Sequence, residues 1–194
     1  MSIQPHSYLT PEEYLAIERE AEFKSEYYNG QMFAMAGAKR RHNLAAANIA
    51  GEIGNQLKQR PGEVYIGHMR VRVSDTGLYT YPDVVAACEE ILFEDEEEDT
   101  LLNPVLIVEV LSRSTEAYDR GDKFEFYRKL DSLMDFVLIT QNRMRVEHYT
   151  RKSDGTWLLS ELTLPHQTVQ LAALQCEILL SEIYSKVKLL PELP

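Results

Sequence analysis

Two short apolar runs in the middle of the chain follow the pattern of buried β-strands. Residues 105–111 are Val-Leu-Ile-Val-Glu-Val-Leu, and residues 81–87 are Tyr-Pro-Asp-Val-Val-Ala-Ala. Each run contains one carboxylate, Glu109 in the first and Asp83 in the second. An ionised carboxylate in an apolar interior is so unfavourable that it takes up a proton, pairs with a cation or binds a metal. Two acids on two core strands therefore indicate one shared site.

Helical patterns surround these strands. Residues 10–13, Thr-Pro-Glu-Glu, combine a threonine cap, a proline at the first helical position and a glutamate three residues after the cap. These three signals predict a helix that runs to about Phe23. Further helices are expected over residues 42–57, 118–130 and 179–187.

Strand patterns fill most of the remaining sequence. Asn29 and Gly30 lie between aromatic and apolar residues and predict a hairpin, because both turn positions must accept a positive φ. Further strands are expected at residues 64–73, 135–140, 143–149 and 157–162. We interpret residues 64–73 as one half-exposed strand. The order of elements predicts a single α/β domain over residues 1–194, with a central mixed β-sheet flanked by α-helices and with additional hairpins.

Charge and hydropathy exclude some classes of function. The net charge is −11, which argues against nonspecific coating of nucleic acid, but residues 94–99 alone contribute −6, so the remainder carries −11 + 6 = −5. A local basic surface stays possible, and residues 94–99 are expected to form a solvated loop. No run approaches the roughly 20 apolar residues of a membrane helix, and the N-terminus lacks a signal-peptide pattern. We expect no membrane contact and a cytoplasmic location.

The two acidic strands have two possible roles. If they are neighbours, Asp83 and Glu109 project from one face, and their oxygen ligands suit magnesium or manganese. Alternatively, each acid pairs with Arg70 or Arg72 of an adjacent strand in a buried salt bridge. The spacing alone leaves both interpretations open.

Lys123 adds a cation to this constellation. It shares one face of a predicted helix with Phe126, Tyr127 and Leu130, at offsets of three, four and seven. That face points toward the sheet, so the ammonium must reach solvent or meet the two acids. It forms either a plain ion pair or a group that stabilises a hydroxide or a phosphoryl charge.

These residues resemble the PD-(D/E)xK nuclease superfamily, which has the restriction-endonuclease-like fold. Pro82-Asp83 and Glu109-Val110-Leu111 match its two acidic elements. The wider chain resembles the Uma-two family of bacterial endonucleases over residues 26–30 (EYYNG), 41–43 (RHN), 81–85 (YPDVV), 108–112 (VEVLS) and 118–124 (YDRGDKF). The resemblance extends over nearly the whole chain.

The resemblance implies a metal-dependent endonuclease that hydrolyses phosphodiester bonds in DNA with Mg²⁺ or Mn²⁺. The implied metal ligands are the carboxylates of Glu26, Asp83 and Glu109 and the carbonyl oxygen of Val110. The implied catalytic lysine is Lys123.

The chain departs from the superfamily at one position. The pattern places lysine two residues after the second acid, where this chain has Leu111. Lys123 lies on an apolar helix face and is a plausible substitute. The alternative is a catalytically degenerate nucleic-acid-binding or assembly protein that keeps the nuclease fold.

Candidate contacts to nucleic acid come from two segments. Arg41 and His42 lie near the start of a predicted helix, where free backbone N–H groups attract phosphate, although a capping or surface histidine is the simpler explanation. Arg70 and Arg72 either line a DNA track or form the charged outer face of an edge strand. A homodimer is expected, because two copies would concentrate positive charge around a shared cleft.

Overall fold

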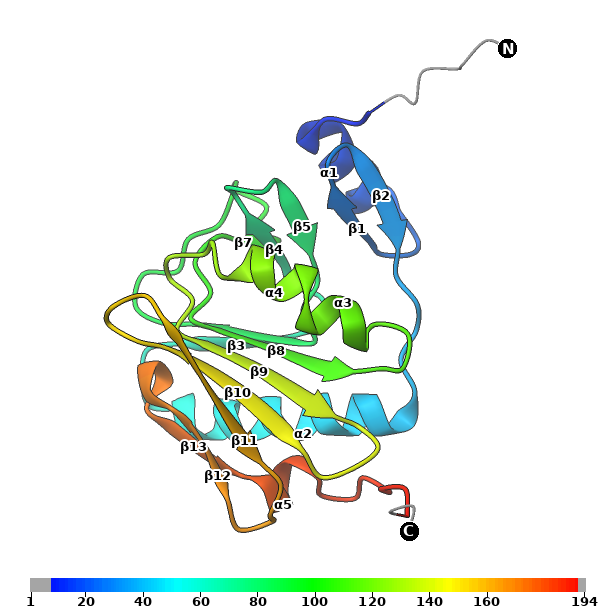
Figure 1. Cartoon of the computed structure of the whole chain (residues 1–194). Coiled ribbons are helices and arrows are strands. Elements are labelled where there is room, and N and C mark those ends of the chain that lie inside the picture. Colours follow the sequence, from blue (N-terminus) through cyan, green and yellow to red (C-terminus); the bar gives the residue numbers. More distant parts are fainter. Residues whose placement is uncertain (1–7, 192–194) are drawn as a thin grey trace.

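A mixed six-stranded sheet lies at the centre of the computed structural model, which describes residues 8–191 (Figure 1). Its strands follow the order β11-β10-β9-β8-β6-β3. Their bounds are β3 Glu63–Ile66, β6 Val84–Ala87, β8 Leu106–Leu111, β9 Asp135–Thr140, β10 Val146–Arg151 and β11 Trp157–Leu162. β8 and β9 are parallel, and the other neighbouring strands are antiparallel. The expected mixed sheet flanked by helices is confirmed.

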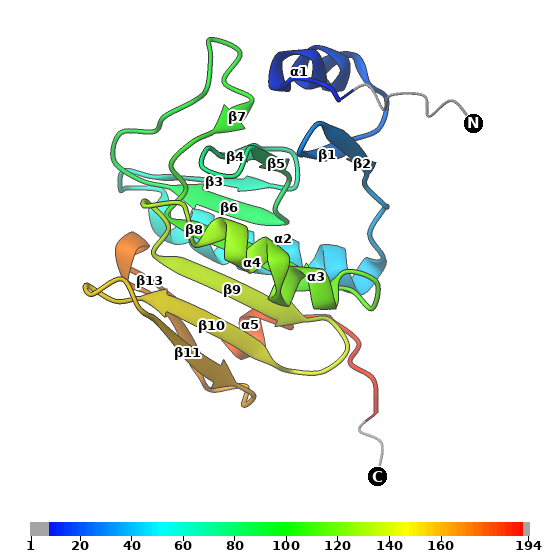
Figure 2. The same ribbon diagram turned by 45° about the horizontal axis from the view of Figure 1, so that its top comes forward.

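Helices cover both faces of this sheet. α2 (Arg40–Leu57) packs on one face, and α3 (Glu116–Arg120) and α4 (Asp122–Tyr127) lie over the other (Figure 2). Successive residues of a strand point to opposite faces, so Val108 joins the α2 side while Ile107 and Leu111 join the α4 side. Full burial of such side chains stabilises the fold by about 1.5–3 kcal/mol each. Glu109 therefore lies on the α4 side.

A five-stranded sheet packs beside the first one, in the order β2-β1-β5-β4-β7. Its bounds are β1 Ser25–Tyr28, β2 Gln31–Ala34, β4 Arg70–Val73, β5 Leu78–Thr80 and β7 Thr100–Leu101. The β1–β2 turn is confirmed, with φ values of 48° at Asn29 and 79° at Gly30. α1 (Pro11–Glu20) has the expected capping box and packs on this sheet, where Tyr14 and Tyr27 stack with ring centroids 4.9 Å apart.

The C-terminal segment packs against α2. The strands β12 (Thr168–Leu171) and β13 (Cys176–Leu179) form a hairpin around the 3-10 helix η1 (Ala172–Leu174), and α5 (Leu180–Ile183) follows. The terminal helix expected over residues 179–187 is shorter in the structure, because β13 takes Leu179 and the helix already ends at Ile183. Within residues 8–191, no helix is long and apolar enough to cross a membrane.

Two further predictions were wrong in detail because a glycine interrupts the pattern. Residues 64–73 form two strands in different sheets, separated at Gly67, whose φ is 58°. Residues 118–130 contain two short helices that meet at Gly121, where φ is −103° and ψ is −101°. These breaks place β4 inside the second sheet and α4 over β8.

The acidic run 94–99 is more than a solvated loop. Arg19 lies 2.8 Å from Asp95 and 2.9 Å from Asp99, and Arg72 lies 2.5 Å from Glu94. The run therefore links α1 to the second sheet, because its carboxylates form ion pairs with arginines of both elements.

Candidate active site

The strands that follow Asp83 and contain Glu109 are neighbours, which is the condition for the two acids to project from one face. Asp83 immediately precedes β6, which pairs antiparallel with β8 in the register Val84 opposite Val108. The backbone N–H of Val110 donates a 2.7 Å hydrogen bond to Oδ2 of Asp83. This hydrogen bond joins Asp83 to the residue that follows Glu109, which brings the two acidic positions close together.

Lys123 of α4 reaches the same place. Its Nζ lies 2.9 Å from Oε1 of Glu109, 3.0 Å from Oε1 of Glu26 on β1 and 4.0 Å from Oδ1 of Asp119. Its side chain is only 6% exposed. The structure thus brings together Glu26, Asp83, Glu109 and Lys123 from four separate segments, as expected from the sequence.

Two hydroxyl groups complete the cluster. The hydroxyl of Tyr127, one turn after Lys123, donates a 2.8 Å hydrogen bond to Oε1 of Glu109. The hydroxyl of Thr80 on β5 donates to Oε1 of Glu26. The helical pattern places Tyr127 on the inward face of its helix but does not predict this contact, and neither Thr80 nor Asp119 was predicted as a site residue from the sequence. The four-residue spacing of Asp119 from Lys123 was the available signal.

The cluster carries surplus negative charge. Burial, together with the negative charges of Asp83 and Asp119, raises the pKa of Glu109 to about 8 against the attraction of Lys123. Burial opposes the charged form of Lys123, yet the nearby carboxylates, Glu109 foremost, hold its pKa well above the ordinary value. Three carboxylates, those of Glu26, Glu109 and Asp119, therefore share one lysine ammonium, and an additional cation or proton would stabilise them.

His42 approaches this cluster from α2. Its Nε2 lies 3.1 Å from Oδ2 of Asp83, the oxygen that also accepts the hydrogen bond from Val110. Its Nδ1 is buried without a hydrogen-bond partner within the described part of the chain. Both contacts fall on one oxygen, so the other oxygen of Asp83 is free of hydrogen bonds from residues 8–191. His42 is therefore neither a helix cap nor a plain surface residue.

The donor atoms of the cluster are of the chemical type that binds a divalent metal. Asp83, Glu109 and the carbonyl of Val110 offer oxygen ligands, the type that Mg²⁺ and Mn²⁺ prefer, and the surplus negative charge favours a cation. In the arrangement described for residues 8–191, no three His, Cys, Asp or Glu side chains are grouped closely enough to hold an ion. Lys123 lies between Glu26 and Glu109 instead. The site therefore fits a metal by its ligands, and Lys123 holds the acids together in this structure.

The structure corrects the expectations for the two strand arginines. Arg70 is 2% exposed, and its guanidinium donates to Thr100 at 2.8 Å and to the hydroxyl of Tyr81 at 2.9 Å. It pairs with the acidic run, as Arg72 does, and neither residue pairs with Asp83 or Glu109. The expectation that Asp83 and Glu109 pair with Arg70 or Arg72 is therefore wrong, and Arg70 is too deeply buried to contact DNA.

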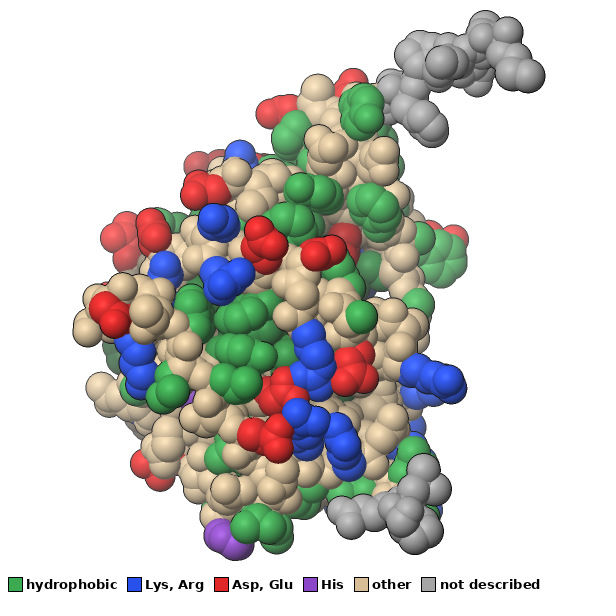
Figure 3. Space-filling model, viewed as in Figure 1, with side chains coloured by type: hydrophobic (Ala, Val, Ile, Leu, Met, Phe, Trp, Pro, Cys, Tyr) green, Lys and Arg blue, Asp and Glu red, His purple; other side chains and the backbone are tan. Residues whose placement is uncertain are grey.

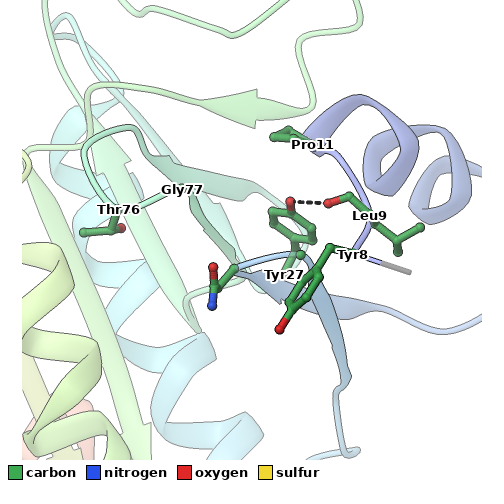
Figure 4. A pocket seen from close by; sticks show the side chains of 8 residues that line it. Tyr8, Leu9, Pro11, Tyr27, Thr76 and Gly77 are labelled. Atoms are coloured by element: carbon green, nitrogen blue, oxygen red, sulfur yellow. Dashed lines mark hydrogen bonds between the residues drawn. The ribbon is translucent and has the colours of Figure 1, made fainter. Parts of the chain in front are cut away.

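A separate cavity of about 270 Å³ lies away from the cluster, between the β1–β2 turn and the segment before α1. Figure 4 shows the hydroxyl of Tyr27 beside it, donating a 2.8 Å hydrogen bond to the carbonyl of Leu9. Its lining residues are Tyr8, Leu9, Pro11, Tyr27, Asn29, Gly30, Thr76 and Gly77. None of these is charged at neutral pH, so the cavity does not form part of the candidate active site.

Comparison with known proteins agrees with this architecture. Residues 11–181 match the model of the Uma2 family, described as "Putative restriction endonuclease". Two uncharacterized proteins of Synechocystis sp. are similar: sll1609, 39% identical over 79% of this chain and 87% of its own length, and slr1290, 35% identical over 80% of each. A crystal structure from Anabaena variabilis, described as "a putative nuclease belonging to DUF820", superposes with a TM-score of 0.75 at 17% identity, covering 91% of this chain and 98% of that one. The last match supports the fold.

Proposed function

The chain belongs to the Uma2 family, and we propose that it is a metal-dependent nuclease that hydrolyses phosphodiester bonds in DNA. The observation that carries this proposal is the cluster in which Glu26 and Glu109 contact the buried ammonium of Lys123, while Asp83 is bonded to the residue that follows Glu109. Buried groups whose pKa is strongly shifted, as are those of Glu109 and Lys123, are more frequent at catalytic sites than in ordinary cores.

Each residue has a distinct role in this proposal. Asp83, Glu109 and the Val110 carbonyl would hold Mg²⁺ or Mn²⁺, with Glu26 as a further ligand. The bound ion would supply Lewis acidity, lower the pKa of a coordinated water and offset phosphate charge. Lys123 offsets the negative charge that gathers on the phosphoryl oxygens.

Neighbouring groups position these residues. Tyr127 fixes one oxygen of Glu109, and His42 and the Val110 N–H fix one oxygen of Asp83. Groups of this kind keep a ligand in one orientation, and their removal commonly weakens metal affinity about 10–100-fold. A homodimer remains part of the proposal, because the acidic chain gains from concentrating its cations around one cleft.

A second candidate is a structural charge network that binds nucleic acid or a partner without turnover. The pairing of Lys123 with both Glu26 and Glu109 favours it, because the cluster is partly self-compensated. The two candidates differ in their response to metal. Ligand binding to the folded state raises the melting temperature by linkage, whereas a self-contained network is indifferent to Mg²⁺ and EDTA.

The test is cleavage of supercoiled and single-stranded DNA with Mg²⁺, Mn²⁺ or EDTA. We expect metal-dependent cleavage that is lost in Asp83→Asn, Glu109→Gln and Lys123→Ala. Glu147→Gln is the matched control, because Glu147 is a buried carboxylate paired with Arg145 at 2.8 Å, outside the cluster. Activity that survives all three cluster substitutions would reject the mechanism, and metal-stimulated binding without cleavage would support the second candidate.

A further inference from the structure

Three aromatic side chains border the acidic cluster. Phe33 of β2 lies directly opposite Glu26 in the β1–β2 register, and Tyr28 lies two residues after Glu26 on the same strand. Directly opposed residues and residues two apart share one face of a hairpin. Phe126 of α4, three residues after Lys123, packs on Tyr28 with ring centroids 4.8 Å apart. We call Tyr28, Phe33 and Phe126 the aromatic rim.

The hydrophobic core does not require Tyr28 and Phe33, the two residues of the aromatic rim that lie on the hairpin. The opposite face of the hairpin supplies the buried contacts, where Tyr27 and Met32 pack against α1. Phe33 is 49% exposed and Tyr28 36% exposed, and Figure 3 shows hydrophobic side chains at the surface over this hairpin. Exposed aromatic side chains beside a functional site indicate a ligand that covers them.

Cations gather at another side of the cluster. Lys39 and Arg40 lie at the start of α2, close to His42, while Arg113 follows β8 and Arg143 follows β9. β8 and β9 are parallel, so Arg113 and Arg143 both lie just beyond the same end of these two strands. Arg41 contacts Asn142 at this end, at 3.2 Å. Lys39, Arg40, Arg113 and Arg143 are exposed and make no salt bridge within residues 8–191. We call these four residues the basic arc.

We propose that the site takes nucleic acid with unpaired nucleotides, whose bases stack on the aromatic rim while the backbone follows the basic arc. In a duplex the base faces are stacked on one another and are closed to a protein ring. Aromatic platforms beside cationic grooves are the usual means of holding single strands. Four exposed cations on a chain of net charge −11 are few for binding a duplex through its phosphates alone, so stacking supplies the missing affinity.

This inference rests on the proposed function only for the location of the scissile phosphate, and binding tests it separately. Fluorescence anisotropy with EDTA measures affinity for a labelled single strand of about 20 nucleotides, longer than the site of one small domain, and for its duplex. We expect tighter binding of the single strand, and loss on the order of tenfold in Phe33→Ala and in Tyr28→Ala. Phe33→Leu, which keeps an apolar side chain but removes the ring, should lose as much.

Controls separate stacking from general apolar contact. Leu159→Ala removes an equally exposed apolar side chain, 49% exposed on β11, and should leave affinity unchanged. A strand that contains 2-aminopurine should lose fluorescence on binding, because stacking quenches this base, and Phe33→Leu should reverse that loss. Arg113→Ala should reduce the salt dependence of binding without restoring the fluorescence.

Specific results would overturn the proposal. Tighter binding of the duplex, or single-strand affinity unchanged in Phe33→Ala and Phe33→Leu, would reject it even if the protein cleaves DNA. Conversely, failure to cleave any DNA would reject the proposed function while stacking and preference for single strands stood. If Phe33→Ala instead abolished a dimer measured by light scattering and left DNA affinity unchanged, the aromatic rim would be an interface between copies of the chain.

Discussion

The asymmetry of charge around Lys123 leads to a prediction about stability that needs no enzymatic assay. Replacing Lys123 with methionine removes the single ammonium from among Glu26, Glu109 and Asp119, and leaves their carboxylates buried or half-buried. Removing one partner from a buried ion pair costs about 3–5 kcal/mol, because the other charge is left uncompensated. We therefore expect Lys123→Met to lower the free energy of unfolding by about that amount.

Glu109→Gln should be far milder. The pKa of Glu109 is raised to about 8, so the folded protein disfavours this charge, and Lys123 keeps Glu26 at 3.0 Å when Glu109 is neutral. We expect a loss of about 1 kcal/mol or less, chiefly from the weakened hydrogen bond to Tyr127. In the double variant, the cost of Lys123→Met should fall by about 2 kcal/mol, a coupling energy typical of residues in one charged network.

Urea unfolding followed by circular dichroism at neutral pH with EDTA measures these values, after a check of two-state behaviour. Lys129→Met is the matched control, because Lys129 is exposed and should change stability by about 0.5 kcal/mol or less. Equal losses for Lys123→Met and Glu109→Gln, with additive effects in the double variant, would refute the idea that the cluster has surplus negative charge.

Three further predictions concern the acidic run, the β1–β2 turn and the position of His42 in the candidate site. The pKa of Asp99 is lowered by its hydrogen bonds to arginine, so its stabilising effect is present above its unfolded pKa of about 3.9 and is lost as pH falls toward the folded value. Asp99→Asn should thus destabilise the fold by about 1–2 kcal/mol at neutral pH, less than for a fully buried pair because the side chain is 34% exposed. The unfolding curves of the variant and the wild type should converge in acid. A difference that stays constant with pH would contradict this prediction. Gly30→Ala should lower stability by about 1–2 kcal/mol in thermal unfolding, because φ is 79° there; an unchanged midpoint would show that the turn relaxes. His42→Ala should weaken Mn²⁺ affinity about tenfold in a calorimetric titration, and unchanged affinity would remove His42 from its positioning role.

The sequence predicted the candidate site better than the connections around it. Asp83 and Glu109 could be assigned to one face because strand side chains alternate strictly, and Lys123 because a charged residue on an apolar helix face needs a partner. Glu26 entered through the family resemblance alone. The distances between these side chains depend on how the β1–β2 hairpin, the central sheet and α4 pack together. No local sequence pattern specifies that packing.

Other features lay beyond local patterns for identifiable reasons. Alternation over residues 64–73 is the same whether the chain continues or changes sheet at Gly67, so two strands appeared as one. Arg70 looked like a surface cation because its partners, Thr100 and Tyr81, come from other strands. A buried arginine is recognisable only when such long-range partners are known.

Binding of Mn²⁺ measured by isothermal titration calorimetry tests the central claim most directly, because the claim is that the acidic cluster holds a catalytic divalent ion. We predict specific binding to the wild type that is lost in Asp83→Asn and in Glu109→Gln, and that is retained in Glu147→Gln. An absence of binding, or binding that is equal in all four proteins, would contradict the proposal and leave the cluster as a structural network of charges.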